Sequence, residues 1–129
     1  MAKRTPVSPE AAAKHGADVA LAERFDDLFA QARTAERHLR EAQANGASLE
    51  ELHRAGKHLD SALTDVMRAA FAAQRAEIGP HGYDDRIYRR KAMATTPVRA
   101  WTMEAQRLLT MRESHRLTGI VRLPPTPAV

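Results

Sequence analysis

Two stretches decide the fold of this chain: residues 21–42, LAERFDDLFAQARTAERHLREA, and residues 52–73, LHRAGKHLDSALTDVMRAAFAA. In each stretch, apolar or small residues recur at alternating spacings of four and three. These positions are Leu21, Phe25, Leu28, Ala32, Ala35, Leu39 and Ala42 in the first stretch, and Leu52, Gly56, Leu59, Leu63, Val66, Ala70 and Ala73 in the second. An average period of about 3.5 residues is typical of helices that pack against another helix along a narrow seam.

A short turn separates the two stretches and predicts that the helices run antiparallel. Residues 45–47, Asn-Gly-Ala, leave room only for a tight reversal, and such a connection is typical of an αα-hairpin. Ser48 and Glu51 have the spacing of a capping box at the start of the second helix. We therefore expect one long helix from its cap at Asp18 to about Ala44, and a second that ends near Ile78.

Turn and cap residues divide the rest of the chain. Ser8-Pro9-Glu10 predicts a short helix from Pro9 to about His15, and Thr96-Pro97 predicts a third helix that ends before Gly119. The expected fold class is all-α: a long, coiled-coil-like antiparallel helical hairpin plus a third helix, with extended N- and C-terminal arms. The expected segments are a flexible arm (1–8), the short helix and hairpin (9–78), a basic and aromatic loop (79–96), the third helix (97–118) and a proline-rich extended tail (119–129).

Composition narrows the classes of protein. The chain has 129 residues, which suits one small domain, and no cysteine, which excludes disulfides and thiolate chemistry. No apolar run approaches the roughly 20 residues needed to cross a bilayer, and the first residues lack the apolar segment of a signal peptide. We expect no membrane association and a location in the cytoplasm, or in a particle assembled there.

Motifs for catalysis, metals and nucleotides are weak. One Glu-x-x-His occurs at Glu50–His53, whereas a di-iron helical bundle needs two such motifs and two further glutamates. The adjacent acids Asp84 and Asp85 are typical of a turn, and the lone loop histidine, His81, is typical of a solvated position. No glycine-rich phosphate loop is present. We expect no catalytic residue, no metal site and no cofactor.

Two sets of residues are candidates for binding partners. Met67, Phe71 and Ile78 form a second apolar stripe on the second long helix, away from the seam, and need either the third helix or another subunit to cover them. The third helix adds Trp101 and Leu108 on its own apolar face, so these five residues are the predicted protein–protein interface. The loop supplies the second set, which combines cations with aromatic rings: Tyr83, Arg86, Tyr88, Arg89, Arg90 and Lys91.

The charge distribution leaves two functions open. Residues 18–78 carry 8 basic and 11 acidic side chains, a net charge of −3, whereas residues 79–129 carry 9 basic and 4 acidic ones, a net charge of +5. Such asymmetry suits head-to-tail association of identical subunits, and it also suits a nucleic-acid contact.

The prediction is a non-catalytic helical assembly or scaffold protein that forms homo-oligomers or is a structural component of a larger particle. Its expected partners are itself and other proteins of an assembly. Small helical proteins of bacterial or phage particles share this outline, which is an analogy of architecture alone. The alternative is an accessory protein that binds nucleic acid through the basic loop, residues 83–91.

Overall fold

The computed structural model describes residues 6–129, and every regular element in that range is a helix. The predicted all-α class is therefore confirmed. The elements are α1 (Pro9–Glu23), α2 (Phe25–Ala44), α3 (Leu49–Ile78), the 3₁₀ helix η1 (Pro80–Tyr83), α4 (Arg86–Ala92) and α5 (Thr96–Thr118). Residues 1–5 of the predicted N-terminal arm lie outside the described residues.

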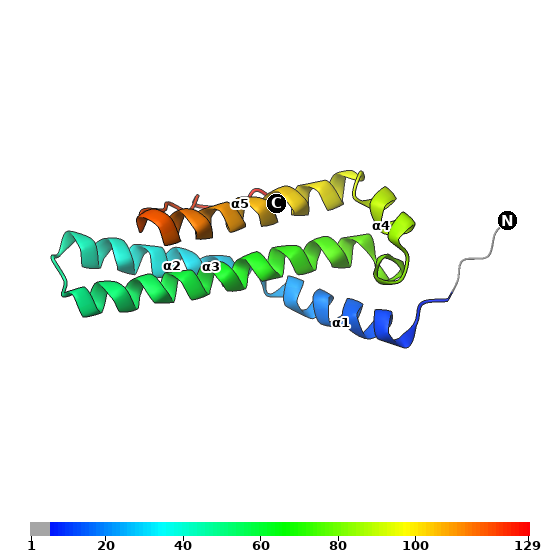
Figure 1. Ribbon diagram of the computed structural model, residues 1–129, viewed down its shortest axis with the longest axis horizontal. Helices are drawn as coiled ribbons and strands as arrows, with labels where there is room; N and C mark the ends of the chain where they lie inside the picture. Colours follow the sequence, from blue (N-terminus) through cyan, green and yellow to red (C-terminus); the bar gives the residue numbers. More distant parts are fainter. Residues whose placement is uncertain (1–5) are drawn as a thin grey trace.

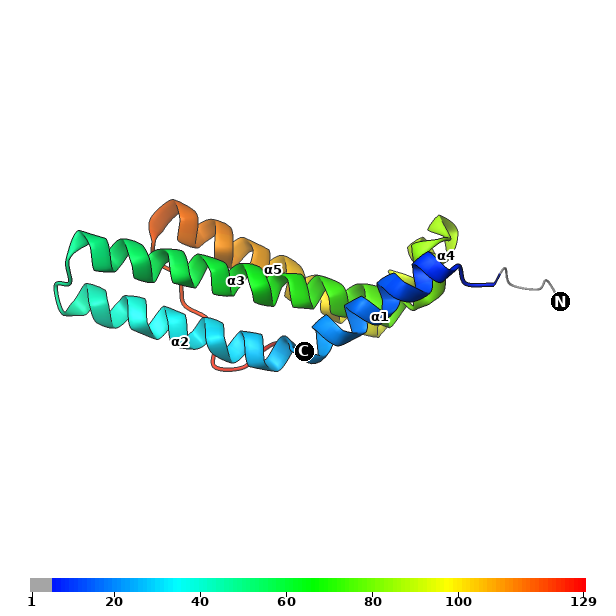
Figure 2. The same cartoon turned by 90° about the horizontal axis from the view of Figure 1, so that it is seen from below.

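Helix α3 is the centre of the molecule. Figure 2 shows it between α2 and α5, and α1 packs against its C-terminal half (Figures 1 and 2). Its buried residues come in adjacent pairs, such as Ala62 with Leu63 and Ala69 with Ala70, so two faces of the helix are apolar rather than one. One face packs on α2 and the other on α5, which gives a single core shared by three helices and the chain terminus.

Local chemistry explains the ends of α2 and α3. Gly46 takes the left-handed conformation, with φ of 64°, in the turn that follows α2. The Ser48 hydroxyl then accepts the backbone N–H of Glu51 at 3.2 Å and caps α3. Gly79, with φ of 99°, and Pro80 end α3 after Ile78.

The predicted boundary between the first two helices is wrong. Helix α1 continues through Gly16 to Glu23, and the chain bends at Arg24 instead of near His15. Asp18 is therefore not a cap but a buried residue in the middle of α1. The bend has no Gly or Pro to cause it; it lets α1 cover the C-terminal half of α3 while α2 covers the N-terminal half (Figure 2).

The predicted loop 79–96 is also wrong in detail, since η1 and α4 occupy most of it. Asp85 begins α4 by accepting the backbone N–H groups of Ile87 and Tyr88, both at 3.0 Å. Residue Thr95, not Thr96, precedes α5, and its hydroxyl bonds the Ala92 carbonyl rather than capping the new helix.

The predicted C-terminal arm does not extend away from the molecule. After Gly119 the chain turns back and lies along α2 and α5 to its end (Figure 2). Leu123 is buried in the common core, with 8% of its surface exposed. In the part of the chain that the structure describes, none of the helices is long and apolar enough to span a bilayer.

The core assignment predicts the effect of placing a charge in it. Leu59 on α3 is fully buried and Leu28 on α2 is 3% exposed. Leu59→Asp or Leu28→Asp should each lower the free energy of unfolding by roughly 4 kcal/mol or more, because a carboxylate would lie unpaired in an apolar core. Thermal unfolding followed by circular dichroism measures this loss. Leu49→Asp is the matched control, because Leu49 is 86% exposed; equal stability of all three variants would contradict the core assignment.

Candidate functional site

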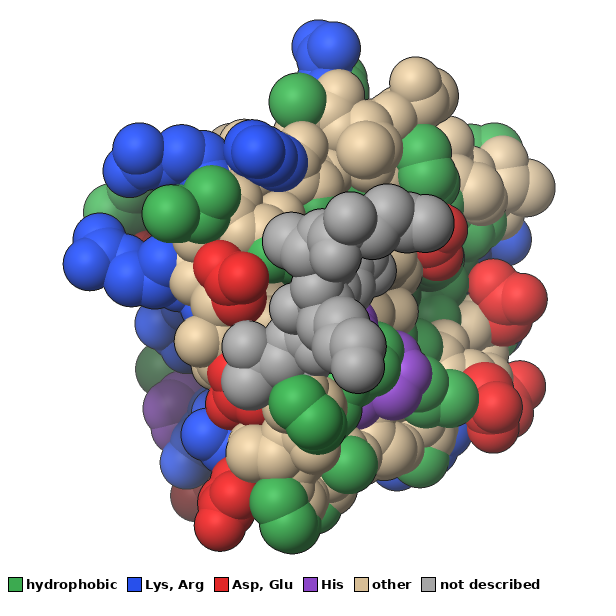
Figure 3. All heavy atoms as spheres, turned by 90° about the vertical axis from the view of Figure 1, so that its right-hand side faces the viewer, with side chains coloured by type: hydrophobic (Ala, Val, Ile, Leu, Met, Phe, Trp, Pro, Cys, Tyr) green, Lys and Arg blue, Asp and Glu red, His purple; other side chains and the backbone are tan. Residues whose placement is uncertain are grey.

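The basic residues of the predicted loop lie at one end of the molecule, around an open hollow. The end of α3, η1 and α4 form its walls, and Figure 3 shows many Lys and Arg side chains gathered on one side of this end. We call this part of the molecule, formed by the end of α3, η1 and α4, the α4 end. The side chains that line the hollow include Arg75, His81, Arg86, Ile87, Tyr88, Arg89, Arg90 and Lys91.

Close packing holds η1 against α3, and α4 is held in turn by η1. A Cβ atom added to Gly82 would lie 2.4 Å from Cγ2 of Ile78, so only glycine allows this approach. The Gly82 carbonyl accepts Nη1 of Arg89 at 2.9 Å, which ties α4 back to η1. Asp84 accepts the backbone N–H and the hydroxyl of Ser8, each at 3.1 Å, and so joins the start of α1 to this end.

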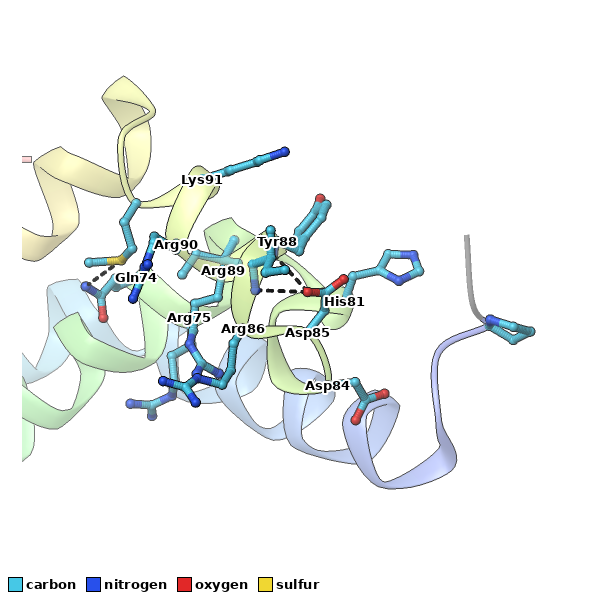
Figure 4. Close-up of a pocket in the computed structure, with 14 residues that line it drawn as sticks. Gln74, Arg75, His81, Asp84, Asp85, Arg86, Tyr88, Arg89, Arg90 and Lys91 are labelled. Atoms are coloured by element: carbon cyan, nitrogen blue, oxygen red, sulfur yellow. Dashed lines mark hydrogen bonds between the residues drawn. The ribbon is translucent and has the colours of Figure 1, made fainter. Parts of the chain in front are cut away.

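Some cations of the α4 end have a partner within the described residues, and others do not. Arg89 is bonded to Gly82, and Arg75 donates two hydrogen bonds to Asp18, at 2.8 and 2.9 Å. Arg86, Arg90 and Lys91 are exposed and form no ion pair or side-chain hydrogen bond with any other residue of 6–129. Figure 4 shows Lys91 pointing away from Arg86 and Arg90, so α4 offers positive charge in more than one direction.

The two tyrosines predicted as stacking residues have different surroundings. The Tyr83 hydroxyl donates to Asp18, and the edge of its ring meets His15 with 6.3 Å between ring centroids. Tyr83 is therefore engaged within the fold, although it is only half-buried. The Tyr88 ring lies 5.7 Å from that of His81, between centroids, at the edge of the hollow.

Asp18, Arg75 and Tyr83 form a polar latch that joins α1, α3 and η1. Burial raises the pKa of the Asp18 carboxyl, but the hydrogen bonds from Arg75 and Tyr83 and the positive charge of Arg75 outweigh burial and hold that pKa below its usual value. Burial and the hydrogen bond to Asp18 raise the pKa of the Tyr83 phenol. The carboxylate is thus charged and the phenol neutral at pH 7, which are the states that the latch requires.

The five predicted interface residues are mostly covered within the chain. Met67, Ile78 and Leu108 are 8%, 7% and 0% exposed, and Phe71 and Trp101 are partly buried against the same core. The Trp101 ring meets Phe25 edge to face, with 5.0 Å between centroids. The physical reason is that α1 and α5 both pack on α3, so the second stripe does not need another subunit to cover it.

The described residues contain no group of three or more His, Asp or Glu side chains placed to hold a metal ion. Glu50 and His53 line a shallow part of the α3 surface, away from the α4 end. Asp84 accepts hydrogen bonds from Ser8, and Asp85 caps the start of α4.

Sequence reasoning missed three buried carboxylates. Asp18 is 9% exposed, Glu36 on α2 is 5% exposed and Glu104 on α5 is 1% exposed. Glu36 and Glu104 bind the C-terminal segment, at Leu123 and Ala128. No sequence signal distinguishes these acids from the exposed ones, because acidic residues on helices are usually at the surface.

No protein-family model, curated protein or solved structure matches this chain. The function is therefore argued from the site alone.

The latch predicts how stability depends on pH. Because the pKa of Asp18 is lower in the folded protein, its stabilisation is complete above the unfolded value near 3.9 and is lost as the pH falls through the lower, folded value. Asp18→Asn should lower the free energy of unfolding at pH 7 by roughly 2 kcal/mol. The difference in free energy of unfolding between this variant and the unchanged chain should become smaller below about pH 4. Denaturant titrations at several pH values measure it. Asp65→Asn, at an exposed position on α3, is the control; a pH-independent difference would contradict the latch.

Proposed function

We propose that this chain is a non-catalytic helical assembly protein whose α4 end binds an acidic surface on a neighbouring protein molecule. One observation carries the proposal: Arg86, Arg90 and Lys91 stand on one short helix without a partner in residues 6–129. Unpaired cations at such density repel one another, and an acidic partner relieves that repulsion.

The apolar residue beside these cations favours a protein partner over a nucleic acid. Ile87 is 69% exposed and lines the same hollow, so α4 combines apolar contact area with charge. A nucleic-acid site needs stacking rings and a field of one sign. Tyr83 is engaged with Asp18, and the carboxylates of Asp84 and Asp85 lie next to α4, where they would repel phosphates.

The partner surface that we propose is the junction between α1 and α2 of a second copy. Glu23, Asp26 and Asp27 are close in sequence and exposed there. In Figure 1 the junction lies apart from α4, which is at the end of the molecule. A contact between two different patches is heterologous, and it builds rings or filaments rather than two-fold dimers. This suits a component of a larger particle.

Replacing the unpaired cations tests the proposal. The unchanged chain should self-associate at about 50 mM salt and dissociate at about 0.5 M salt, because exposed charges are screened at high ionic strength. The variant Arg86→Ala/Arg90→Ala/Lys91→Ala should remain monomeric at both. Sedimentation velocity measures the oligomeric state, and binding to single- and double-stranded DNA is measured on the same samples by fluorescence anisotropy.

The matched control is Arg54→Ala/Lys57→Ala/Arg68→Ala. It also removes two arginines and one lysine, but from exposed positions on α3. The control should assemble like the unchanged chain. The junction variant Glu23→Gln/Asp26→Asn/Asp27→Asn should fail to assemble with itself. Loss of DNA binding in the α4 variant with intact assembly would overturn the proposal and favour the nucleic-acid alternative.

A further inference from the structure

The C-terminal segment, residues 119–129, lies in a strip between α2 and α5 that has the features of a peptide-binding site. The chain reverses at Gly119, whose φ of 67° is left-handed. From there it runs back between the two helices toward the α1–α2 junction (Figure 2). Arg33 on α2 donates to the carbonyl of Pro125 at 2.9 Å, and Gln43 donates to that of Gly119 at 3.4 Å.

Two buried carboxylates on different helices bind the segment in the same way. Glu36 on α2 pairs through Oε1 with Arg40, four residues later, and Glu104 on α5 pairs through Oε1 with Arg107, three residues later. Each glutamate directs Oε2 to the segment: Glu36 to the N–H of Leu123 at 3.3 Å, and Glu104 to the N–H of Ala128 at 2.8 Å.

With the segment docked, both carboxylates are shielded from water. The side chains of Glu36 and Glu104 are 7% and 0% exposed. A carboxylate this deep is costly unless its oxygens are hydrogen-bonded, and the arginine satisfies only one oxygen of each. The second oxygen therefore requires a donor, and the backbone N–H groups of the segment supply it.

The segment has the matching chemistry. Residues 123–128 read Leu-Pro-Pro-Thr-Pro-Ala, so only Leu123, Thr126 and Ala128 carry a backbone N–H, and the buried carboxylates accept two of these three. The prolines favour an extended conformation before binding, which lowers the entropy lost on docking. Leu123, whose N–H bonds Glu36, also buries its side chain in the common core.

We infer that the strip between α2 and α5 is a binding site for an extended, proline-rich peptide, and that it exchanges the C-terminal segment between copies of this chain. The segment of a second copy is identical, so it makes the same contacts in a neighbour's strip. Residues 123–128 occupy the strip, so the three residues between Gly119 and Leu123 connect the two copies. They span about 10 Å when extended, so the neighbour's strip has to lie close to the end of α5. The balance between the two arrangements then depends on protein concentration relative to the effective concentration of the chain's own segment.

This inference is separate from the α4 contact, because α4 lies at the end of the molecule, away from the C-terminal segment (Figures 1 and 2). Its experiment is therefore run at about 0.5 M salt, where the α4 contact is screened. If the exchange of the C-terminal segment is disproved, the proposal for the α4 end is unaffected, and the reverse also holds.

Two complementary full-length variants test the exchange. The acceptor, Leu123→Asp, keeps both glutamates, but the new carboxylate next to Glu36 expels its own segment. The donor, Glu36→Leu/Glu104→Leu, keeps its segment but lacks both acceptors. Each should be monomeric alone, whereas a mixture should form a heterodimer at least about tenfold more abundant than either homodimer. Native mass spectrometry identifies the pair by mass, and circular dichroism checks that each variant is folded.

The control replaces the donor with one that also carries Leu123→Asp, and the heterodimer should then disappear. A labelled synthetic peptide of residues 119–129 provides a second measurement on folded, full-length chains. It should bind the acceptor at least about tenfold more tightly than the unchanged chain, whose own segment occupies the strip. A peptide that binds neither chain would overturn the site. Peptide binding without a heterodimer would overturn the exchange between copies.

Discussion

The burial of α3 is the constraint on which the rest of the structure depends. From Leu59 onward, buried residues occupy two faces of this helix, including fully buried Ala69, Ala70 and Ala72. One partner helix covers only one face, so α2 alone leaves the other exposed to water. Helix α5 and the C-terminal segment complete the core with α2, and α1 covers the C-terminal half of α3. The small side chains let the backbones approach closely, which compensates for the scarcity of large aromatic residues.

The seam residues and the glycines predict much of this fold, whereas the tertiary contacts do not appear in the sequence. The heptad spacing and the turns at Gly46, Gly79 and Gly119 depend on local physics, and they correctly locate α3 and the ends of α2 and α5, but not the start of α2. The bend at Arg24 is different. Its φ and ψ, −87° and 0°, are close to helical, and none of the neighbouring residues is a glycine or proline that would break a helix. Long-range contacts lie on both sides of the bend, between Asp18 and Arg75 and between Phe25 and Trp101, and such contacts cannot be read from local sequence.

The candidate site shows the same division. The cluster of cations at residues 86–91 could be predicted from composition, but which of them remain available could not. Arg89 donates a hydrogen bond to the Gly82 carbonyl, and Tyr83 donates one to Asp18. Both hydrogen bonds depend on how η1 packs onto α3. The start of α4 did have a local signal, because an Asp before a run of helix-forming residues is a cap, and Asp85 has that role. The buried acids Glu36 and Glu104 had none, since their partners are a segment far along the chain.

Pairing inside the molecule also changes where its surface charge lies. Four acids pair with arginines of the same chain: Asp18, Glu36, Asp60 and Glu104. The number of acidic residues in the sequence is therefore larger than the number of unpaired carboxylates on the surface. The acids that remain exposed include Glu23, Asp26 and Asp27 at the α1–α2 junction, next to the exposed Arg24. The bend at Arg24 exposes the N-terminus of α2 there, and acids in the first turn of a helix are favoured by its dipole. The same bend that allows α1 to cover α3 therefore also presents Asp26 and Asp27 together with Glu23, on a surface whose charge is opposite to that of α4.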